Sequence, residues 1–128
     1  MEKVTSEPEE MLPLTPAVLH ILLALADGER HGYGIMKEAA MHTQGRMRMG
    51  PGTLYGAIKR MLAANLIEES DERPDPELDD ERRRYYRLTE FGQQVAAAEV
   101  KRLSNLIKLA QTKRLLKRTA LTPSEEGA

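Results

Sequence analysis

Apolar residues recur at helical spacing three times in the first half of the chain. The spacing predicts a helix that begins at Pro16 after a capping Thr15 and ends at Asp27-Gly28. A second helix is predicted from about Gly32 to His42, and a third from about Gly52 to Ala64. The predicted inward-facing residues are Val18, Ile21, Leu22 and Leu25, then Ile35, Met36, Ala39 and Ala40, then Leu54, Ile58, Met61 and Leu62.

Three short segments have the alternating pattern of strands. GRMRM (45–49) alternates Arg with Met, as a half-buried strand would, and LIEE (66–69) and RRYYRL (83–88) follow the third helix. The intervening segment 70–82 has two prolines and almost no apolar residue. These features predict a two-stranded ribbon with a long, exposed hairpin loop.

The two ends of the chain differ in character. Residues 1–13 are polar and acidic with two prolines, which predicts a flexible arm. Thr89 is placed to cap a long helix from Glu90 to about Arg118, and residues 119–128 form a predicted tail. The apolar stripe of this helix consists of Ala96, Val100, Leu103, Leu106, Ile107 and Ala110. The expected fold is therefore mainly α with a small β-ribbon.

Composition narrows the class of protein. A chain of 128 residues without cysteine has room for one modest core and no disulfide or thiolate metal site. The longest apolar run, AVLHILLALA, is far shorter than the roughly 20 residues of a membrane span. The polar N-terminus is unlike a secretory signal. We therefore expect a soluble, cytoplasmic protein.

Charge is segregated along the chain although the net charge is only −1. Residues 67–80 contain eight acidic residues and one Arg, whereas residues 81–88 contain four Arg and one Glu. Residues 89–118 are again basic, with seven cations against two acids. A near-neutral total thus conceals blocks of opposite sign.

The order of the predicted elements is that of a winged helix-turn-helix, in which the third helix enters the major groove of DNA and the ribbon loop reaches the flanking backbone. The third helix suits that role, because the face opposite its apolar stripe has no acidic residue. That face consists of Thr53, Gly56, Lys59, Arg60 and Ala63. Taken alone, the Lys-Arg pair is also typical of a solvated helix face, and the Arg run at 82–84 could simply neutralise the neighbouring acids.

Three motifs add a family resemblance. HGYGIMKEA, PGTLYGAIKRM and RRYYRLTEFG resemble the PadR family of bacterial transcriptional regulators over about residues 14–118. The resemblance implies a winged-helix DNA-binding domain at 14–88, a C-terminal dimerisation helix at 89–118, and repression by binding operator DNA. The candidate DNA-binding residues are Tyr33, Thr53, Leu54, Tyr55, Gly56, Lys59, Arg60, Arg82, Arg83 and Arg84.

The final helix also predicts a homodimer, because its apolar stripe has no following element to cover it. The first helix has a second apolar stripe that a partner subunit could cover. The candidate dimerisation residues are Leu19, Leu23, Val100, Leu103, Leu106, Ile107 and Ala110. Two recognition helices related by a two-fold axis would read a palindromic operator with half-sites roughly 34 Å apart. The alternative is that both stripes pack within one chain.

No motif fixes a ligand, although family members answer to phenolic acids or drugs. A small hydrophobic effector, if one binds, is expected in the groove between the final helices and the first helix. No cofactor or metal is predicted, because the three histidines lie on separate elements without metal-ligand spacing.

Two other functions are compatible with parts of the sequence. An enzyme with a nucleotide loop at Gly50, Gly52 and Gly56 is disfavoured, because no buried strand precedes those glycines and no nucleophile–base pair is evident. A winged-helix module that binds protein instead of DNA is the stronger alternative, since the acidic block at 68–80 would suit a basic partner.

Overall fold

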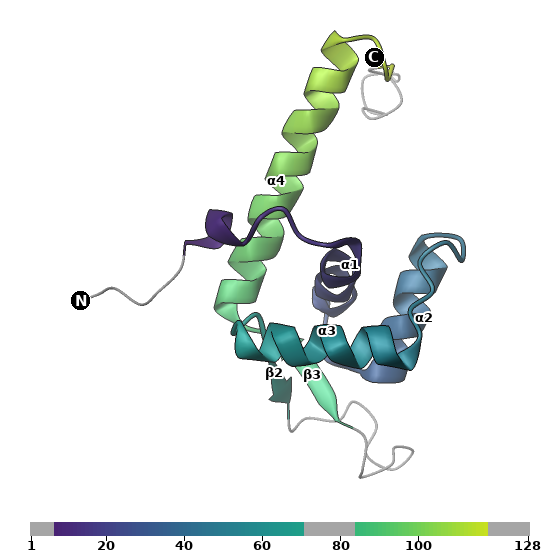
Figure 1. Cartoon of the computed structure of the whole chain (residues 1–128), viewed down its shortest axis with the longest axis vertical. Coiled ribbons are helices and arrows are strands. Elements are labelled where there is room, and N and C mark those ends of the chain that lie inside the picture. The colour runs from purple at the N-terminus through teal and green to yellow at the C-terminus, as the bar shows by residue number, and fades with distance from the viewer. Residues whose placement is uncertain (1–6, 71–83, 118–128) are drawn as a thin grey trace, which may run out of the picture.

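The computed structural model describes residues 7–70 and 84–117. Its described elements form a body of three helices and a small sheet, from which a long fourth helix projects (Figure 1). In chain order they are η1 (Pro8–Met11), α1 (Pro16–Leu25), β1 (Arg30–His31), α2 (Gly32–His42), α3 (Pro51–Ala63), β2 (Ile67–Ser70), β3 (Tyr85–Leu88) and α4 (Glu90–Thr112).

The four predicted helices are confirmed. Their ends lie close to the predicted residues, except for the C-terminal end of α4. The Thr15 hydroxyl accepts a hydrogen bond from the backbone N–H of Val18 at 3.2 Å, so Thr15 caps α1 as predicted. The Thr89 hydroxyl caps α4 in the same way, accepting from Gly92 at 2.9 Å. α4 ends at Thr112, earlier than the sequence predicts, and Arg118 with the 119–128 tail lies outside the described residues.

The sheet has three antiparallel strands in the order β1-β3-β2. The ribbon of β2 and β3 was predicted, but the strand predicted at GRMRM is wrong, because residues 45–49 are irregular. The third strand is instead Arg30–His31, which pairs with Tyr85 and Tyr86 of β3. Met49 is buried and Met47 packs against the core, so the Arg–Met alternation reflects half-burial without strand pairing.

The core lies where α1, α2 and α3 meet. Ile21 and Leu22 of α1 are completely buried, and the inner face of α3 packs against them. The inward positions predicted for the three helices are confirmed as buried or partly buried. The buried hydrophobic residues are Ile21, Leu22, Ala24, Leu25, Ile35, Ala39, Met49, Leu54, Ala57, Ile58, Met61, Leu66, Ile67, Tyr85, Tyr86 and Val95.

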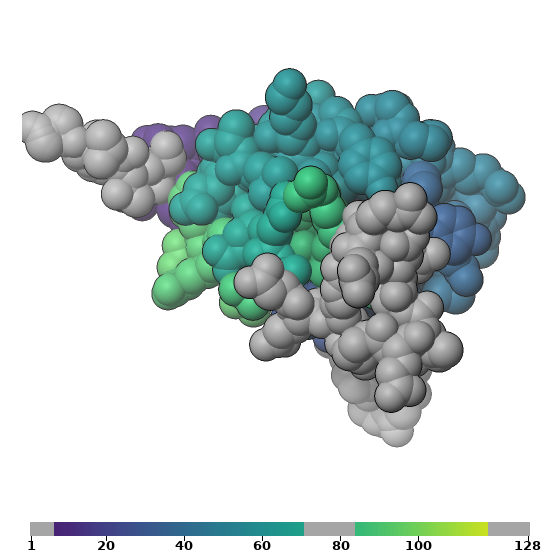
Figure 2. Space-filling model, turned by 90° about the horizontal axis from the view of Figure 1, so that it is seen from below, coloured from purple at the N-terminus to yellow at the C-terminus, as the bar shows by residue number. Residues whose placement is uncertain are grey.

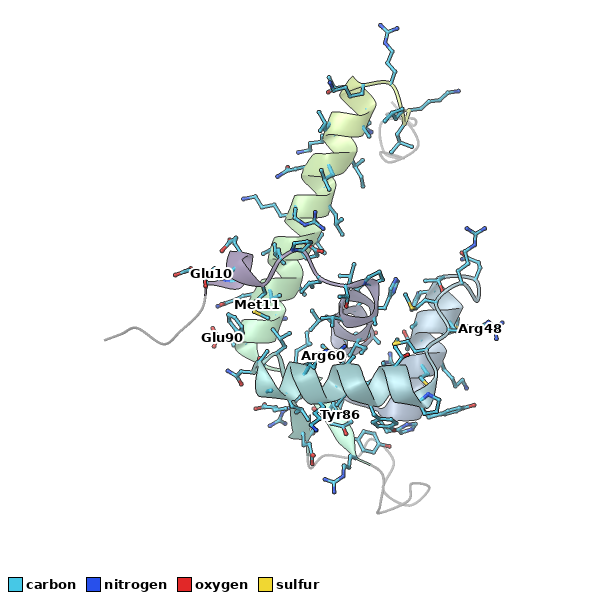
Figure 3. All side chains as sticks on the ribbon, viewed as in Figure 1. Glu10, Met11, Arg48, Arg60, Tyr86 and Glu90 are labelled. Carbon is cyan, nitrogen blue, oxygen red and sulfur yellow. The ribbon has the colours of Figure 1, made fainter. Side chains whose placement is uncertain are left out.

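A flexible arm was predicted for residues 1–13; residues 1–6 lie outside the described residues, and residues 7–13 differ from the prediction. Residues Pro8–Met11 form a 3-10 helix that packs on α4, and Met11 and Leu12 are partly buried against the core (Figure 3). The low apolar content of residues 1–13 concealed this contact, because two adjacent apolar side chains are enough to anchor one turn.

α4 is divided into a packed half and a projecting half. Gly92, Val95 and Glu99 are buried against the body, whereas the described residues after Glu99 include no buried one. The second half extends away from the other elements (Figure 1). Among the described residues, no helix is long and apolar enough to cross a membrane.

The carbonyl group of Leu66 joins α3, the sheet and α4. Asn65, at φ 63°, ends α3 in a Schellman motif, in which Leu66 donates to Met61 at 2.9 Å and Asn65 donates to Leu62 at 3.1 Å. The backbone N–H of Thr89 then donates to the Leu66 carbonyl at 3.1 Å. Gly92 lies so close that a Cβ atom there would overlap this carbonyl oxygen. The TEFG motif therefore fixes where α4 starts.

Gly92→Ala should destabilise the fold by about 1–3 kcal/mol, because the added methyl group forces Leu66 and α4 apart. Gly56→Ala is the matched control, since the nearest atom to a Cβ there is Arg60 Nη1 at 3.6 Å. Alanine should stabilise α3 by up to about 1 kcal/mol. Urea unfolding followed by circular dichroism measures both; equal stability of the two variants would contradict the close contact.

Candidate nucleic-acid interface

α3 presents two chemically distinct faces. Leu54, Ala57, Ile58 and Met61 are buried on one side, whereas the exposed residues on the other include Thr53, Tyr55, Lys59 and Arg60. The teal atoms of α3 are uncovered along the upper part of the surface in Figure 2. This exposed face has no acidic residue, which favours approach to a polyanion.

Leu54 was a candidate DNA-binding residue, and this assignment is wrong. Its side chain is 0% exposed and belongs to the hydrophobic core. Leu54 is one of the inward-facing positions of the helical pattern, and burial excludes it from contact with a ligand. Its place in the PGTLY motif reflects packing.

At the start of α3, no capping side chain of the described residues accepts hydrogen bonds from the backbone N–H groups of the first turn. Gly50 is the N-cap and makes no side-chain hydrogen bond, Pro51 is the first helical residue, and the first turn contains no acidic residue. Gly52 and Thr53 are exposed. The free N–H groups and the positive end of the helix dipole thus lie beside the exposed face.

Tyr55 and Tyr33 are brought together around Gly32. A Cβ atom on Gly32 would lie 2.8 Å from Cζ of Tyr55, so only glycine allows the phenol ring to pack there. Tyr55 remains 49% exposed and Tyr33 is 58% exposed. Lys37 Nζ lies 5.6 Å from the Tyr33 ring centroid, in cation–π range. The HGY and PGTLY motifs therefore meet in one partly exposed aromatic patch.

The cations of the described chain fall into two groups. Four of them form ion pairs with carboxylates: Arg30, Arg84, Arg87 and Arg102. In the described part of the chain no ion pair engages Lys37, Arg46, Arg48, Lys59 or Arg60. These five lie on α2, on α3 or in the segment between them, and are available to an anionic ligand. The described cations of α4 and the segment after it that likewise have no ion pair are Lys101, Lys108, Lys113, Arg114 and Lys117.

Arg46 and Arg48 were missed as site residues, because GRMRM was interpreted as a strand. Both side chains are exposed in the segment before α3. Figure 3 shows Arg48 beside the start of α3 and Arg60 farther along the helix. Arg48 Nε donates to the carbonyl of Gly45 at 2.9 Å, which holds the base of the guanidinium group against the loop. Two arginines directly before a helix with an acid-free face were the signal that could have found them.

The ribbon contributes less free charge than predicted. Arg84 pairs with Glu69 at 3.1 Å, and Arg87 pairs with Glu68 at 2.9 Å. Arg82, Arg83 and most of the acidic loop lie outside the described residues. Burial, followed by the nearby Glu69 carboxylate, raises the pKa of the Tyr86 phenol, so it stays neutral between the ribbon and the core. Arg84 is therefore neutralised by Glu69 of β2, whereas the acids at 75–81, which the Arg run was expected to neutralise in the alternative interpretation, lie outside the described residues.

A cavity of about 450 Å³ lies between α1 and α2. It does not coincide with the groove between the first and final helices where an effector was expected. Its carboxylates are already paired, since Arg30 binds Asp27 at 3.2 Å and Glu38 at 3.3 Å. The lining residues are His20, Leu23, Ala24, Ala26, Asp27, Glu38, Ala39 and His42.

Three packed helices with an exposed, cationic third helix, next to an antiparallel ribbon, define a winged helix-turn-helix protein. Residues 21–98 match the transcriptional regulator PadR-like family. The chain belongs to this family of transcriptional regulators, as the HGY, PGTLY and RYYRLT motifs predict.

Relatives extend the comparison. The chain is 35% identical over 88 residues to the transcriptional regulator Rv3488 of Mycobacterium tuberculosis, covering 69% of this chain and 76% of that protein. It is 36% identical over 90 residues to an uncharacterized 37.1 kDa protein in transposon TN4556 of Streptomyces fradiae, covering 70% of this chain. The matched region spans only 24% of that protein's length.

Among solved structures, a PadR family transcription regulator from Clostridium difficile has the same fold. The two structures give a TM-score of 0.63 at 25% sequence identity, over 77% of this chain and 97% of that one. The winged-helix architecture predicted from the sequence is thereby confirmed.

Proposed function

We propose that this regulator binds double-stranded DNA sequence-specifically as a homodimer and represses transcription from a palindromic operator. The observation that supports it best is the acid-free, unpaired cationic surface formed by α3 and the segment before it. Residues 14–88 constitute the DNA-binding unit and residues 89–118 the dimerisation helix in this proposal.

The solvent-facing residues of α3 that could contact DNA have distinct chemical roles in the proposal. Lys59 neutralises a backbone phosphate, and Arg60 offers a guanidinium group to a phosphate or a guanine edge. Thr53 and the free N–H groups beside it bind a phosphate at the helix start. Gly56 lets the helix backbone approach the wall of the groove, because no side chain stands between them. Tyr33 and Tyr55 position the DNA backbone through their hydroxyl groups.

The homodimer is supported by apolar surface on the projecting half of α4. Val100 is 49% exposed and Leu106 48% exposed, on a helix half that no described element covers. An isolated helix of this length is marginally stable in water, so burial against a second copy would stabilise it. Leu23 of α1, 46% exposed, extends the available apolar surface. The remaining dimerisation candidates are Leu19, Leu103, Ile107 and Ala110.

A two-fold dimer accounts for the palindromic operator, because it presents two α3 helices to successive major-groove segments roughly 34 Å apart. The repressor assignment rests on the resemblance to the PadR family. A small hydrophobic effector stays a prediction. The cavity between α1 and α2 offers it an apolar floor at Leu23, Ala24 and Ala39.

The direct test is fluorescence anisotropy of the purified protein with a labelled duplex from its own promoter, titrated at several salt concentrations. The proposal predicts specific binding whose logarithmic affinity falls linearly and steeply with the logarithm of salt concentration. No binding to promoter or random duplex at low salt would reject DNA binding and favour a protein partner.

Lys59→Ala should weaken promoter binding about tenfold and reduce the salt slope by about one, because one phosphate contact is lost. Lys108→Ala, an exposed lysine on the projecting half of α4, is the matched control and should bind like the wild type. Unchanged affinity for Lys59→Ala would remove Lys59 from the interface.

Gly56→Ala should also weaken DNA binding, although it stabilises the isolated protein. The added methyl group projects from α3 toward the groove and meets no protein atom closer than 3.6 Å. Anisotropy and urea unfolding on the same sample separate the two effects. Wild-type affinity in a stabilised variant would contradict close approach of the helix backbone to DNA.

The double variant Leu103→Asp/Leu106→Asp should be monomeric in analytical ultracentrifugation, because two carboxylates cannot be buried in an apolar dimer interface. Leu115→Asp is the control, since Leu115 is 81% exposed and lies past the end of α4. A stable dimer of the double variant would refute the assignment of this stripe to dimerisation.

A further inference from the structure

Glu99 is a buried carboxylate for which the proposed function has no use. Its side chain is 1% exposed, and it accepts three hydrogen bonds. Arg102 donates two, from Nε at 2.6 Å and from Nη2 at 2.9 Å. The third comes from the backbone N–H of Leu14 at 3.1 Å. A buried carboxylate is costly without such partners, and here each oxygen has at least one donor.

The donors come from two parts of the chain. Arg102 is one helical turn farther along α4, whereas Leu14 lies 85 residues away in sequence. Leu14 directly precedes Thr15, the cap of α1. Glu99 therefore ties α4 to the point where the N-terminal segment becomes α1.

The N-terminal segment reinforces this tie. Its 3-10 helix η1 packs on α4, and the chain then crosses α4 to reach α1 (Figure 1). Met11, Leu12 and Leu14 are partly buried against the core along this path. α4 is thus bordered by α1 and by the segment that leads into it.

Hydrogen bonding keeps Glu99 ionised despite its burial. The Arg102 hydrogen bonds are the largest influence that lowers the pKa of the Glu99 carboxyl; burial opposes them, and the Leu14 N–H lowers the pKa further. An anion at this position can hold a guanidinium group and an amide at once, which a neutral side chain of the same size does less well.

Glu99 lies at the boundary between the packed half and the projecting half of α4. Glu99 is the last buried residue of α4, and the exposed apolar stripe begins again at Val100. The cluster therefore lies where the helix leaves the winged-helix body.

We propose that Glu99, Arg102 and the Leu14 N–H form a latch that fixes the direction of α4 relative to α3, with Glu99 as the positioning residue. This inference rests on the proposed function, since α4 then joins the two subunits. In the dimer the direction of α4 sets the separation of the two α3 helices. The latch thereby determines which half-site spacing the protein accepts.

The test compares the full-length wild type with Glu99→Gln, which keeps the size of the side chain but loses its charge. The first readout is hydrogen exchange of the segment containing the Leu14 amide. It should exchange at least about tenfold faster in the variant, while the amides of α3 stay unchanged. The reason is that a single neutral amide oxygen replaces the two carboxylate oxygens that accept from Leu14 and Arg102. Exchange at the wild-type rate would overturn the latch.

The second readout is the spacing preference on DNA. The probes are duplexes containing two inverted copies of the half-site that the wild type selects from a random library, with the separation varied by single base pairs. The wild type should bind one separation at least about tenfold more tightly than its neighbours. Glu99→Gln should bind neighbouring separations nearly equally, while its affinity for a duplex with one half-site is unchanged.

Arg102→Gln is the second variant, because Arg102 lies at the surface end of the cluster and its loss leaves the Leu14 hydrogen bond in place. Like Glu99→Gln, it should reduce the difference in affinity between neighbouring half-site separations. If Glu99→Gln does not fold, Arg102→Gln is the variant that tests the latch. A sharp, wild-type preference in a folded variant would overturn the latch and leave DNA binding intact. A wild type that selects no DNA would overturn the proposed function, and the latch with it.

Discussion

One constraint determines how the parts of this protein are joined: the contacts made by the Leu66 carbonyl group. It accepts a hydrogen bond from Thr89 and lies against Gly92, where no side chain could fit. The Schellman motif that ends α3 delivers Leu66 to this point, and β2 begins directly after it. The end of α3, the start of the ribbon and the start of α4 are consequently held together, so the position of α3 is linked to that of α4.

The exposed face of α3 follows from the same packing. Because Leu54, Ala57, Ile58 and Met61 occupy the core, the opposite side of the helix faces solvent. The residues on that side are Thr53, Gly56, Lys59, Arg60 and Ala63. Those residues are small, polar or cationic, and none of the described cations on or beside α3 is consumed by an ion pair. By contrast, the described cations of the ribbon, Arg84 and Arg87, form ion pairs with Glu69 and Glu68. The paired arginines contribute to the sheet, whereas the unpaired cations of α3 can bind an anionic ligand.

Much of the fold could be predicted from the sequence, because the helices combine regular apolar spacing with strong caps at Thr15 and Thr89. β1 was missed because two residues have no periodicity, and its pairing with β3 is a tertiary contact. The packing of η1 on α4 was missed for a similar reason, since its apolar anchors are few and the two elements are far apart in sequence. The hydrogen bond from Leu14 to Glu99, which spans 85 residues, is a tertiary contact of the same kind. Within the candidate site, the α3 residues were predictable from the two faces of one helix. The contribution of Arg46 and Arg48 to the candidate site could not be predicted, because it depends on the path of an irregular segment that has no periodic pattern.

The central claim is that two copies of α3, joined through α4, bind symmetric DNA. Selection of duplexes from a random library by the full-length protein, followed by sequencing and hydroxyl-radical footprinting, tests it most directly. The account predicts an inverted repeat with two protected half-sites about one helical turn apart, roughly 34 Å between centres. Enrichment of a single unrepeated site, or no enrichment over the starting library, would contradict it.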